Sequence, residues 1–164
     1  MRRVNSVFQF TLKGSFDFDK FSDGYYSKKF SGVIIKRDKS RVLLFKSGKV
    51  TVTGLRTRKE AKALLSIIFG GLKLINGKTL NMTFSSKLKF HLDFSRLLRS
   101  GYVTHEPELF PGVYWRNNQS DSRAVIILFA SGKYILTGVK SGKSLKNFHE
   151  SFKTFISQFK KNKV

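Results

Sequence analysis

Two phenylalanines, Phe110 and Phe129, occupy positions where a bulky apolar side chain is hard to bury. Phe110 directly precedes Pro111-Gly112, a turn-forming pair, so we expect it at the tip of a loop. Phe129 ends an apolar strand, and the Ser-Gly-Lys at 131–133 predicts a tight hairpin turn with glycine at a positive φ. Two exposed phenylalanines therefore flank one strand pair and offer apolar contact surface.

An earlier stretch repeats this arrangement, which identifies the chain as a tandem duplication. The offset is 80 residues from Phe30 to Phe110 and 84 residues from Phe45 to Phe129, and extra polar residues at 117–123 account for the difference. The matching segments are FSGVIIK at 30–36 with FPGVYWR at 110–116, VLLFKSGK at 42–49 with IILFASGK at 126–133, and TGLR at 53–56 with TGVK at 137–140.

The composition is strongly basic and contains no cysteine. The 164 residues carry 32 Lys and Arg against 10 Asp and Glu, a formal net charge of +22 that is spread over both halves. A merely solvated surface is one explanation, but charge of this size is more typical of proteins that bind polyanions, nucleic acids above all. Without cysteine, or an apolar run of signal-peptide or membrane-spanning length, we expect an intracellular protein that is not secreted.

Hydrophobic periodicity predicts the same order of elements in both repeats. Strands are expected at 4–12, 33–37, 42–46 and 50–53, and again at 80–90, 113–116, 125–130 and 134–137. Short helices are expected to begin near Asp17 and Asp93, and long helices near Thr57 and Ser144. This order predicts an α+β fold, an antiparallel sheet with helices on one face.

Strand alternation separates two faces of this sheet. In the first repeat one face carries Val42, Leu44, Val50 and Val52, and the other carries Leu43, Phe45, Lys49, Thr51 and Thr53. The second repeat divides in the same way. We expect one set to pack under the helices, where Phe148, Phe152 and Phe155 also belong, and the other set to have no covering element.

The motif EPELFPG at 106–112, the LF-x-SGK hairpins and the T-G-x-K tail, duplicated in this order, resemble the TATA-box-binding protein family. The resemblance extends from about Asn5 to Phe159. It implies two repeats, at 1–78 and 79–164, that share one continuous saddle-shaped antiparallel sheet with the helices on its convex face. It also implies a function, binding and bending of A/T-rich, TATA-like DNA through the minor groove as a platform for transcription initiation. A minor-groove architectural protein without general transcription factor partners is the alternative.

The uncovered face suits this substrate. An apolar, threonine-containing surface with a basic rim fits a flattened, widened minor groove, where A·T pairs offer only acceptors. A G·C pair adds a donor that an apolar surface leaves without a partner, so a preference for A·T follows.

The resemblance assigns a role to individual residues of this face, each weighed against an ordinary core or solvated side chain. The intercalating wedges would be Phe30, Phe45, Phe110 and Phe129. Base-edge contacts would come from Asn5, Val7, Leu43, Thr53, Asn81, Thr83, Ile127 and Thr137. Phosphate contacts would come from Lys29, Lys36, Lys49, Arg56, Arg116, Lys133 and Lys140.

The acidic turn at Glu106, Glu108 and Leu109 resembles the docking point for a transcription factor IIB-like protein, with solubility as the alternative explanation. A transcription factor IIA-like protein is a second candidate partner. We expect a monomer on DNA, with a homodimer as the alternative state without DNA. A compact, diverged, basic member of the family would suit a large DNA virus or a reduced eukaryote, which predicts a nuclear location or a viral replication compartment.

An enzyme is the main rival class, because DNA glycosylases and some ribonucleases contain domains of this topology. The acidic residues are scattered, and the three histidines, His91, His105 and His149, have no metal-ligand spacing. We therefore expect no catalysis, no metal and no cofactor. One departure from the family concerns the uncovered face, since Thr51 stands where a branched apolar residue is usual.

Overall fold

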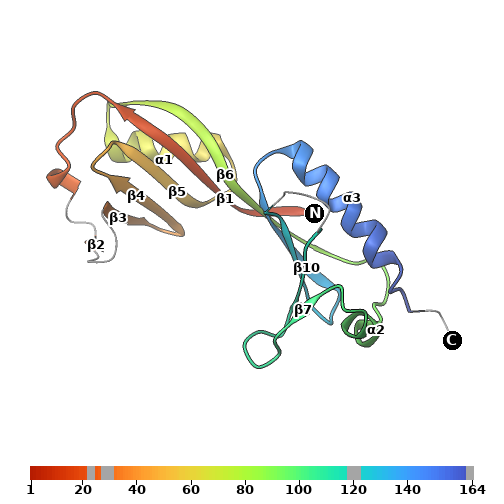
Figure 1. Ribbon diagram of the computed structural model, residues 1–164. Helices are drawn as coiled ribbons and strands as arrows, with labels where there is room; N and C mark the ends of the chain where they lie inside the picture. Colours follow the sequence, from red (N-terminus) through yellow and green to blue (C-terminus); the bar gives the residue numbers. More distant parts are fainter. Residues whose placement is uncertain (22–24, 27–31, 118–122, 162–164) are drawn as a thin grey trace. The chain divides into compact units, whose positions relative to one another are not determined.

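The computed structural model describes residues 1–21, 25–26, 32–117 and 123–161, and its contacts divide the chain into two compact units (Figure 1). The N-terminal unit is Val4–Asn81, and the C-terminal unit is Met82–Val164 together with Met1–Arg3. The predicted sites at Phe30 and Lys29 lie outside the described residues.

In the N-terminal unit, the described antiparallel strands lie in the order β2-β3-β4-β5-β1, the first part of β6 also belongs to the unit, and one long helix follows β5 in the chain. Its elements are β1 (Arg2–Lys13), the 3-10 helix η1 (Asp19–Phe21), β2 (Tyr25–Tyr26), β3 (Gly32–Arg37), β4 (Ser40–Phe45), β5 (Lys49–Leu55), α1 (Arg58–Phe69) and the first part of β6 (Lys73–Lys87).

The C-terminal unit repeats this plan, with antiparallel strands in the order β6-β10-β9-β8-β7. Its elements after β6 are α2 (Phe94–Arg99), β7 (Thr104–His105), β8 (Val113–Trp115), β9 (Val125–Leu128), β10 (Lys133–Val139) and α3 (Gly142–Ser157).

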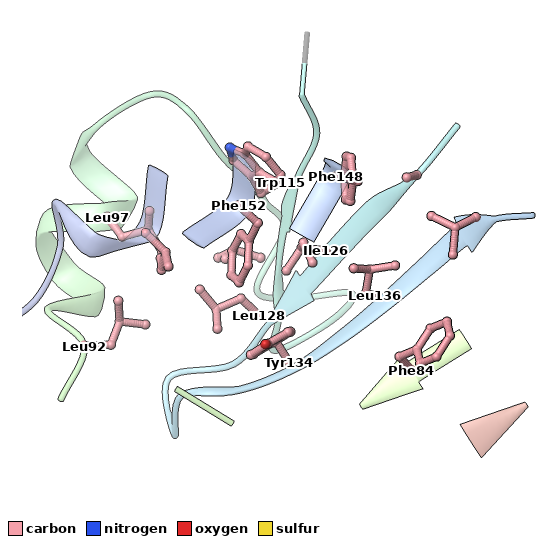
Figure 2. Close-up of a cluster of buried hydrophobic side chains, with 14 of the residues drawn as sticks. Phe84, Leu92, Leu97, Trp115, Ile126, Leu128, Tyr134, Leu136, Phe148 and Phe152 are labelled. Carbon is pink, nitrogen blue, oxygen red and sulfur yellow. The ribbon is translucent and has the colours of Figure 1, made fainter. Parts of the chain in front are cut away.

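Each unit has its own hydrophobic core between one face of its strands and its long helix. In the N-terminal unit, Ala61, Leu65 and Phe69 of α1 pack against buried strand residues such as Phe10 and Leu44. In the C-terminal unit, the cluster in Figure 2 joins Phe148, Phe152 and Ile156 of α3 to the strands. The predicted α+β fold, with helices on one face of an antiparallel sheet, is confirmed for each unit.

The long helices begin at side-chain caps that the sequence contains. Thr57 accepts a hydrogen bond from the backbone N–H of Glu60, and the Glu60 carboxylate accepts one from the backbone N–H of Thr57. In α3 the same reciprocal box joins Ser141 and Ser144. The predicted start near Ser144 was therefore late, because Ser144 is the third helical residue and Ser141 is the cap.

Two pairs of glycines give the repeated motifs the same backbone conformation in both units. Gly48 and Gly132, in the hairpin turns, have φ of 75° and 76°. Gly54 and Gly138, in the two T-G motifs, have φ of 92° and 88°, and a Cβ at either would lie 2.3 Å from a backbone oxygen of the neighbouring segment. Only glycine fits there, since a side chain would be strained and would also clash.

Two predicted boundaries were wrong because of contacts distant in sequence. Strand β6 begins at Lys73 rather than near residue 80, and it includes the Asn76-Gly77 pair. A Cβ at Gly77 would lie 2.8 Å from the Phe10 ring, so the glycine lets the strand cross that ring. The helix expected near Asp17 is only the three-residue η1, which ends at Phe21 with its ring 5.1 Å from that of Phe69.

Candidate nucleic-acid interface

One face of the strands in each unit has no described helix packed on it, and we call it the uncovered face. In the C-terminal unit it carries Ser85, Ile135, Ile127 and Tyr114, which lie side by side on β6, β10, β9 and β8. All four are partly exposed, and the residues on either side of Ile135, Ile127 and Tyr114 belong to the buried core, as does Phe84 beside Ser85. The alternation predicted from the sequence is confirmed.

Phe110 and Phe129 lie together beside this face and are not members of the hydrophobic core formed by the described residues. Their ring centroids are 5.7 Å apart, and the Phe110 ring lies 5.6 Å from that of Tyr114. A Cβ at Gly112 would lie 2.7 Å from the Phe110 ring and 3.2 Å from the Phe129 ring, so the glycine leaves room for both. The two rings thus form a compact, partly exposed aromatic pair.

Hydrogen-bonded turns hold both phenylalanines in place. The backbone N–H of Phe110 donates to the carbonyl of Glu106 at 2.9 Å, which makes the EPELF segment one compact turn. The Phe129 carbonyl accepts from the N–H of Gly132 at 2.9 Å, inside the hairpin turn. Glu106, Glu108 and Leu109 are exposed on that first turn, and the Leu109 side chain is 81% exposed.

The N-terminal unit presents the corresponding row of Gln9, Thr51, Leu43 and Ile34 on β1, β5, β4 and β3. Phe45 ends β4, is partly exposed, and its carbonyl accepts from the N–H of Gly48 at 2.9 Å. This is the geometry of Phe129 and Gly132 in the other unit.

The remaining predicted base-contact residues are partly exposed and polar or small. Asn5 is fixed by two contacts, because its Nδ2 donates to Thr53 Oγ1 at 3.2 Å and its Oδ1 accepts from the N–H of Gly54 at 2.9 Å. Thr83 and Thr137 share a hydrogen bond of 2.9 Å between their hydroxyls. Val7 and Asn81 are partly exposed on β1 and β6.

Basic side chains surround these rows. The described residues predicted to contact phosphate are all exposed, namely Lys36, Lys49, Arg56, Arg116, Lys133 and Lys140. The sequence reasoning missed two more exposed lysines, Lys13 and Lys87, at the ends of β1 and β6. Lys87 is the register partner of Lys133, and the strand alternation already used for Leu43 would have placed both missed lysines on the uncovered faces.

The described residues contain a histidine with a lowered pKa, but neither a metal-ligand cluster nor a helix that could span a membrane. The partly buried His149 ring lies 2.8 Å from the Tyr134 hydroxyl, and burial lowers the pKa of His149. No group of three or more His, Cys, Asp or Glu within the described ranges could hold a metal ion. No helix in those ranges is long and apolar enough to span a membrane.

The chain is similar to known proteins in sequence and in structure. The family model described as transcription factor TFIID, or TATA-binding protein, matches residues 1–75 and 77–159. The TATA-box-binding protein of Thermococcus sibiricus is 35% identical over 86% of this chain and 84% of its own length. That of Saccharomyces cerevisiae is 34% identical over 84% of this chain and 61% of its own length.

The solved structure of Methanococcus jannaschii TBP superposes with a TM-score of 0.81 at 26% identity, covering 96% of this chain and 98% of that one. The TATA-box-binding protein of Candida albicans is 33% identical, and the match spans 62% of its length. The chain thus spans less than two thirds of both yeast relatives. Because the family model matches nearly the whole sequence, the chain belongs to the TATA-binding protein family.

Proposed function

We propose that this protein binds A/T-rich double-stranded DNA through the minor groove, bends it, and serves as a platform for transcription initiation. The observation that carries the proposal is the aromatic pair of Phe110 and Phe129, which lies outside the core and beside an uncovered, basic-rimmed face. Its relatives are named for binding the TATA box. An architectural protein without transcription factor partners is the second candidate.

The hydrogen bonds of Asn5 support recognition of A·T pairs. Its Nδ2 donates one N–H to Thr53 Oγ1 and its Oδ1 accepts from the N–H of Gly54, which leaves the second N–H of the amide for an acceptor of the ligand. Adenine N3 and thymine O2 in the minor groove are acceptors of the kind that this N–H requires. Val7, Leu43, Thr53, Asn81, Thr83, Ile127 and Thr137 would complete the base-edge contacts.

The aromatic side chains would supply the bend. Phe110 with Phe129, and Phe45 with Phe30, would each push between two base pairs, at a cost of a few kcal/mol per unstacked step. TATA-box-binding proteins are themselves the standard example of such wedges, and the bend of about 80° is their value.

A double substitution, Phe110→Ala with Phe129→Ala, tests the proposal. Bending of an A/T-rich duplex, measured by energy transfer between dyes at its ends, should fall strongly while the thermal unfolding transition stays intact. Phe148→Ala is the matched control, because that ring is 4% exposed and its loss should damage folding instead. A double variant that bends the duplex as fully as the parent would refute the wedge assignment.

The exposed cations would neutralise phosphates and make binding depend on salt. With Lys29 included, roughly six to eight neutralised phosphates predict a slope of about −5 to −7 for log affinity against log salt concentration. A slope shallower than about −2 would contradict the phosphate assignment of Lys36, Lys49, Arg56, Arg116, Lys133 and Lys140.

The acidic turn would bind a transcription factor IIB-like protein, with a IIA-like protein as a further partner of a nuclear or viral initiation complex. Glu106, Glu108 and Leu109 project from it, exposed, on a chain whose net charge is +22. Changing both glutamates to Arg should leave DNA affinity unchanged or raised and abolish the ternary complex, measured by mobility shift. A ternary complex that survives would place the docking site elsewhere, and its absence from the parent would favour the architectural function.

A further inference from the structure

Gln9 places an amide on the uncovered face of the N-terminal unit without using it inside the protein. Its strand neighbours Phe8 and Phe10 are buried, so the Gln9 side chain projects from the opposite face, where it is partly exposed. Within the part of the chain that the structure describes, this side chain makes no hydrogen bond. Its carbonyl oxygen and both N–H groups are therefore available to a ligand.

Thr51 lies next to Gln9 and adds a second polar group. The two residues are register partners on β1 and β5, so their side chains project side by side. Thr51 has Leu43 as its partner on the other side, which makes Gln9 and Thr51 a polar pair at the edge of an apolar row. We call them the Gln9–Thr51 pair.

The equivalent place in the C-terminal unit has different chemistry. Ser85 takes the place of Gln9, and Ile135 takes the place of Thr51 as its register partner. The serine hydroxyl is one carbon from the backbone and lines a hollow of about 750 Å³ with Phe129 and Ile135. The Ser85 hydroxyl is therefore close to the backbone beside the larger Ile135 side chain, whereas the Gln9 amide is two carbons further from its own backbone.

The difference bears on the one minor-groove group that separates G·C from A·T. The exocyclic amine of guanine projects into the groove as a donor, and it is tolerated only where the protein offers an acceptor. The Asn5 carbonyl already accepts from the Gly54 N–H, whereas the Gln9 carbonyl and the Thr51 hydroxyl lie on the same face and accept no hydrogen bond from a described residue. Only the N-terminal unit offers an amide acceptor at this place.

We propose that the Gln9–Thr51 pair is an acceptor site for the guanine amine, so that the half-site bound by the N-terminal unit accepts a G·C pair that the other half-site rejects. This inference rests on the minor-groove binding proposed above. It makes the two halves of the DNA site chemically different and therefore orients the protein on the duplex.

Inosine tests the proposal directly, because it pairs with cytosine like guanine and lacks only the minor-groove amine. The parent protein is titrated with A/T-rich duplexes in which one position at a time carries G·C, and then with the same duplexes carrying inosine instead. In one half of the site, replacing guanine by inosine should weaken binding by about threefold to tenfold, the effect of one net hydrogen bond. In the other half the same replacement should strengthen binding.

Substitution then assigns the effect to the pair. Gln9→Leu with Thr51→Val keeps side-chain size and removes the acceptors, so inosine should strengthen binding in both halves of the site. The reciprocal variant, Ser85→Gln with Ile135→Thr, should create a second guanine-accepting position. A thermal unfolding transition shows whether each variant is folded. If the variant with Gln9→Leu is unfolded, Gln9→Met is used in its place.

The outcomes separate this inference from the proposed function. A parent that binds A/T-rich duplex but shows the same response to inosine in both halves overturns the guanine site and leaves minor-groove binding intact. An unchanged response in the Gln9→Leu/Thr51→Val variant overturns it as well. A parent that does not bind A/T-rich duplex overturns the proposed function, and the guanine site with it.

Discussion

The two units share glycines with the same backbone conformation, and they differ in the side chains on their uncovered faces. Hairpin glycines at 48 and 132 have nearly equal φ, and so do Gly54 and Gly138, each of which lies at a β-bulge where the register between neighbouring strands shifts. On the uncovered faces, by contrast, the repeat has Gln9 and Thr51 in one unit and Ser85 and Ile135 at the corresponding positions of the other. The two repeats thus keep the glycines that the backbone conformation requires. They differ in uncovered side chains, which would affect a ligand more than the fold.

The covered and uncovered sides of the same strands differ in a related way. Core residues such as Leu44 and Leu136 are fully buried and contact several neighbours, so their loss leaves a cavity. Residues of the uncovered faces lie outside both cores, so a substitution there should change binding more than folding. Substitutions on the two sides of the strands test this contrast.

The largest effect is expected at Phe152 in the C-terminal core. Its ring is fully buried, 5.5 Å from Trp115 and 5.1 Å from Tyr134, so Phe152→Ala should cost about 3–5 kcal/mol of unfolding free energy. Phe45→Ala, on the uncovered side, should cost no more than about 1 kcal/mol. Chemical denaturation measures both, and equal costs would contradict the separation of core from uncovered face.

The bulge glycines should come next. A Cβ at Gly54 or Gly138 meets a backbone oxygen at 2.3 Å, at a φ that disfavours any side chain, so alanine at either should cost about 2–3 kcal/mol. Gly142→Ala is the control, because a Cβ there meets nothing within 4 Å and alanine favours a helix. Denaturation measures the loss of unfolding free energy at each position. Unequal losses at Gly54 and Gly138 would show that the two bulges do not contribute equally to stability.

Much of the fold was predictable because its signals are local. Alternation of apolar residues located the strands and faces, and the Ser-Gly-Lys turns and the Thr57 cap are read within a few residues. The start of β6 was not predictable, because Asn76-Gly77 reads as a turn unless the Phe10 ring beneath Gly77 is known. Local patterns cannot report a contact made with a residue so distant in the chain.

The residues of the candidate site were likewise predictable only where the signal is local. The partly exposed positions of Phe45, Phe110 and Phe129 followed from turns and strand ends, and the structure places all three outside the cores. Gln9 was not predicted, because the family resemblance assigns the base contacts of this strand to Asn5 and Val7, although alternation places Gln9 on the same face. That its amide makes no hydrogen bond to a described residue was not predictable, because it depends on where side chains distant in sequence lie.

A smaller effect should come from the helix caps, which also recur in both units. Thr57→Ala and Ser141→Ala each remove the acceptor for a backbone N–H of the first helical turn, at about 1 kcal/mol. Thermal unfolding of the two variants should show similar losses. A loss confined to one variant would mean that the two capping boxes differ in importance despite their shared geometry.

The smallest effect should distinguish the two caps by pH. The reciprocal acceptor is a carboxylate in α1, Glu60, and a hydroxyl in α3, Ser144. Hydrogen bonds from the backbone N–H groups of Thr57 and Arg56 lower the pKa of Glu60 below its usual value of 4.5. The unfolded chain therefore binds the proton more tightly than the folded one, and the contribution of Glu60 to stability is present above the unfolded pKa and lost as the pH falls through the lowered folded pKa.

Glu60→Gln isolates this contribution, because glutamine keeps an oxygen for the two N–H groups but cannot titrate. The melting temperature of the parent should exceed that of the variant near neutral pH, and the difference should shrink as the pH falls below 4.5. Ser144→Ala is the matched change in α3, and its deficit should not vary with pH through this range. A parent–variant difference for Glu60→Gln that is constant from neutral to acid pH would mean that the carboxylate charge does not support the cap, and that the two boxes are equivalent in this respect as well.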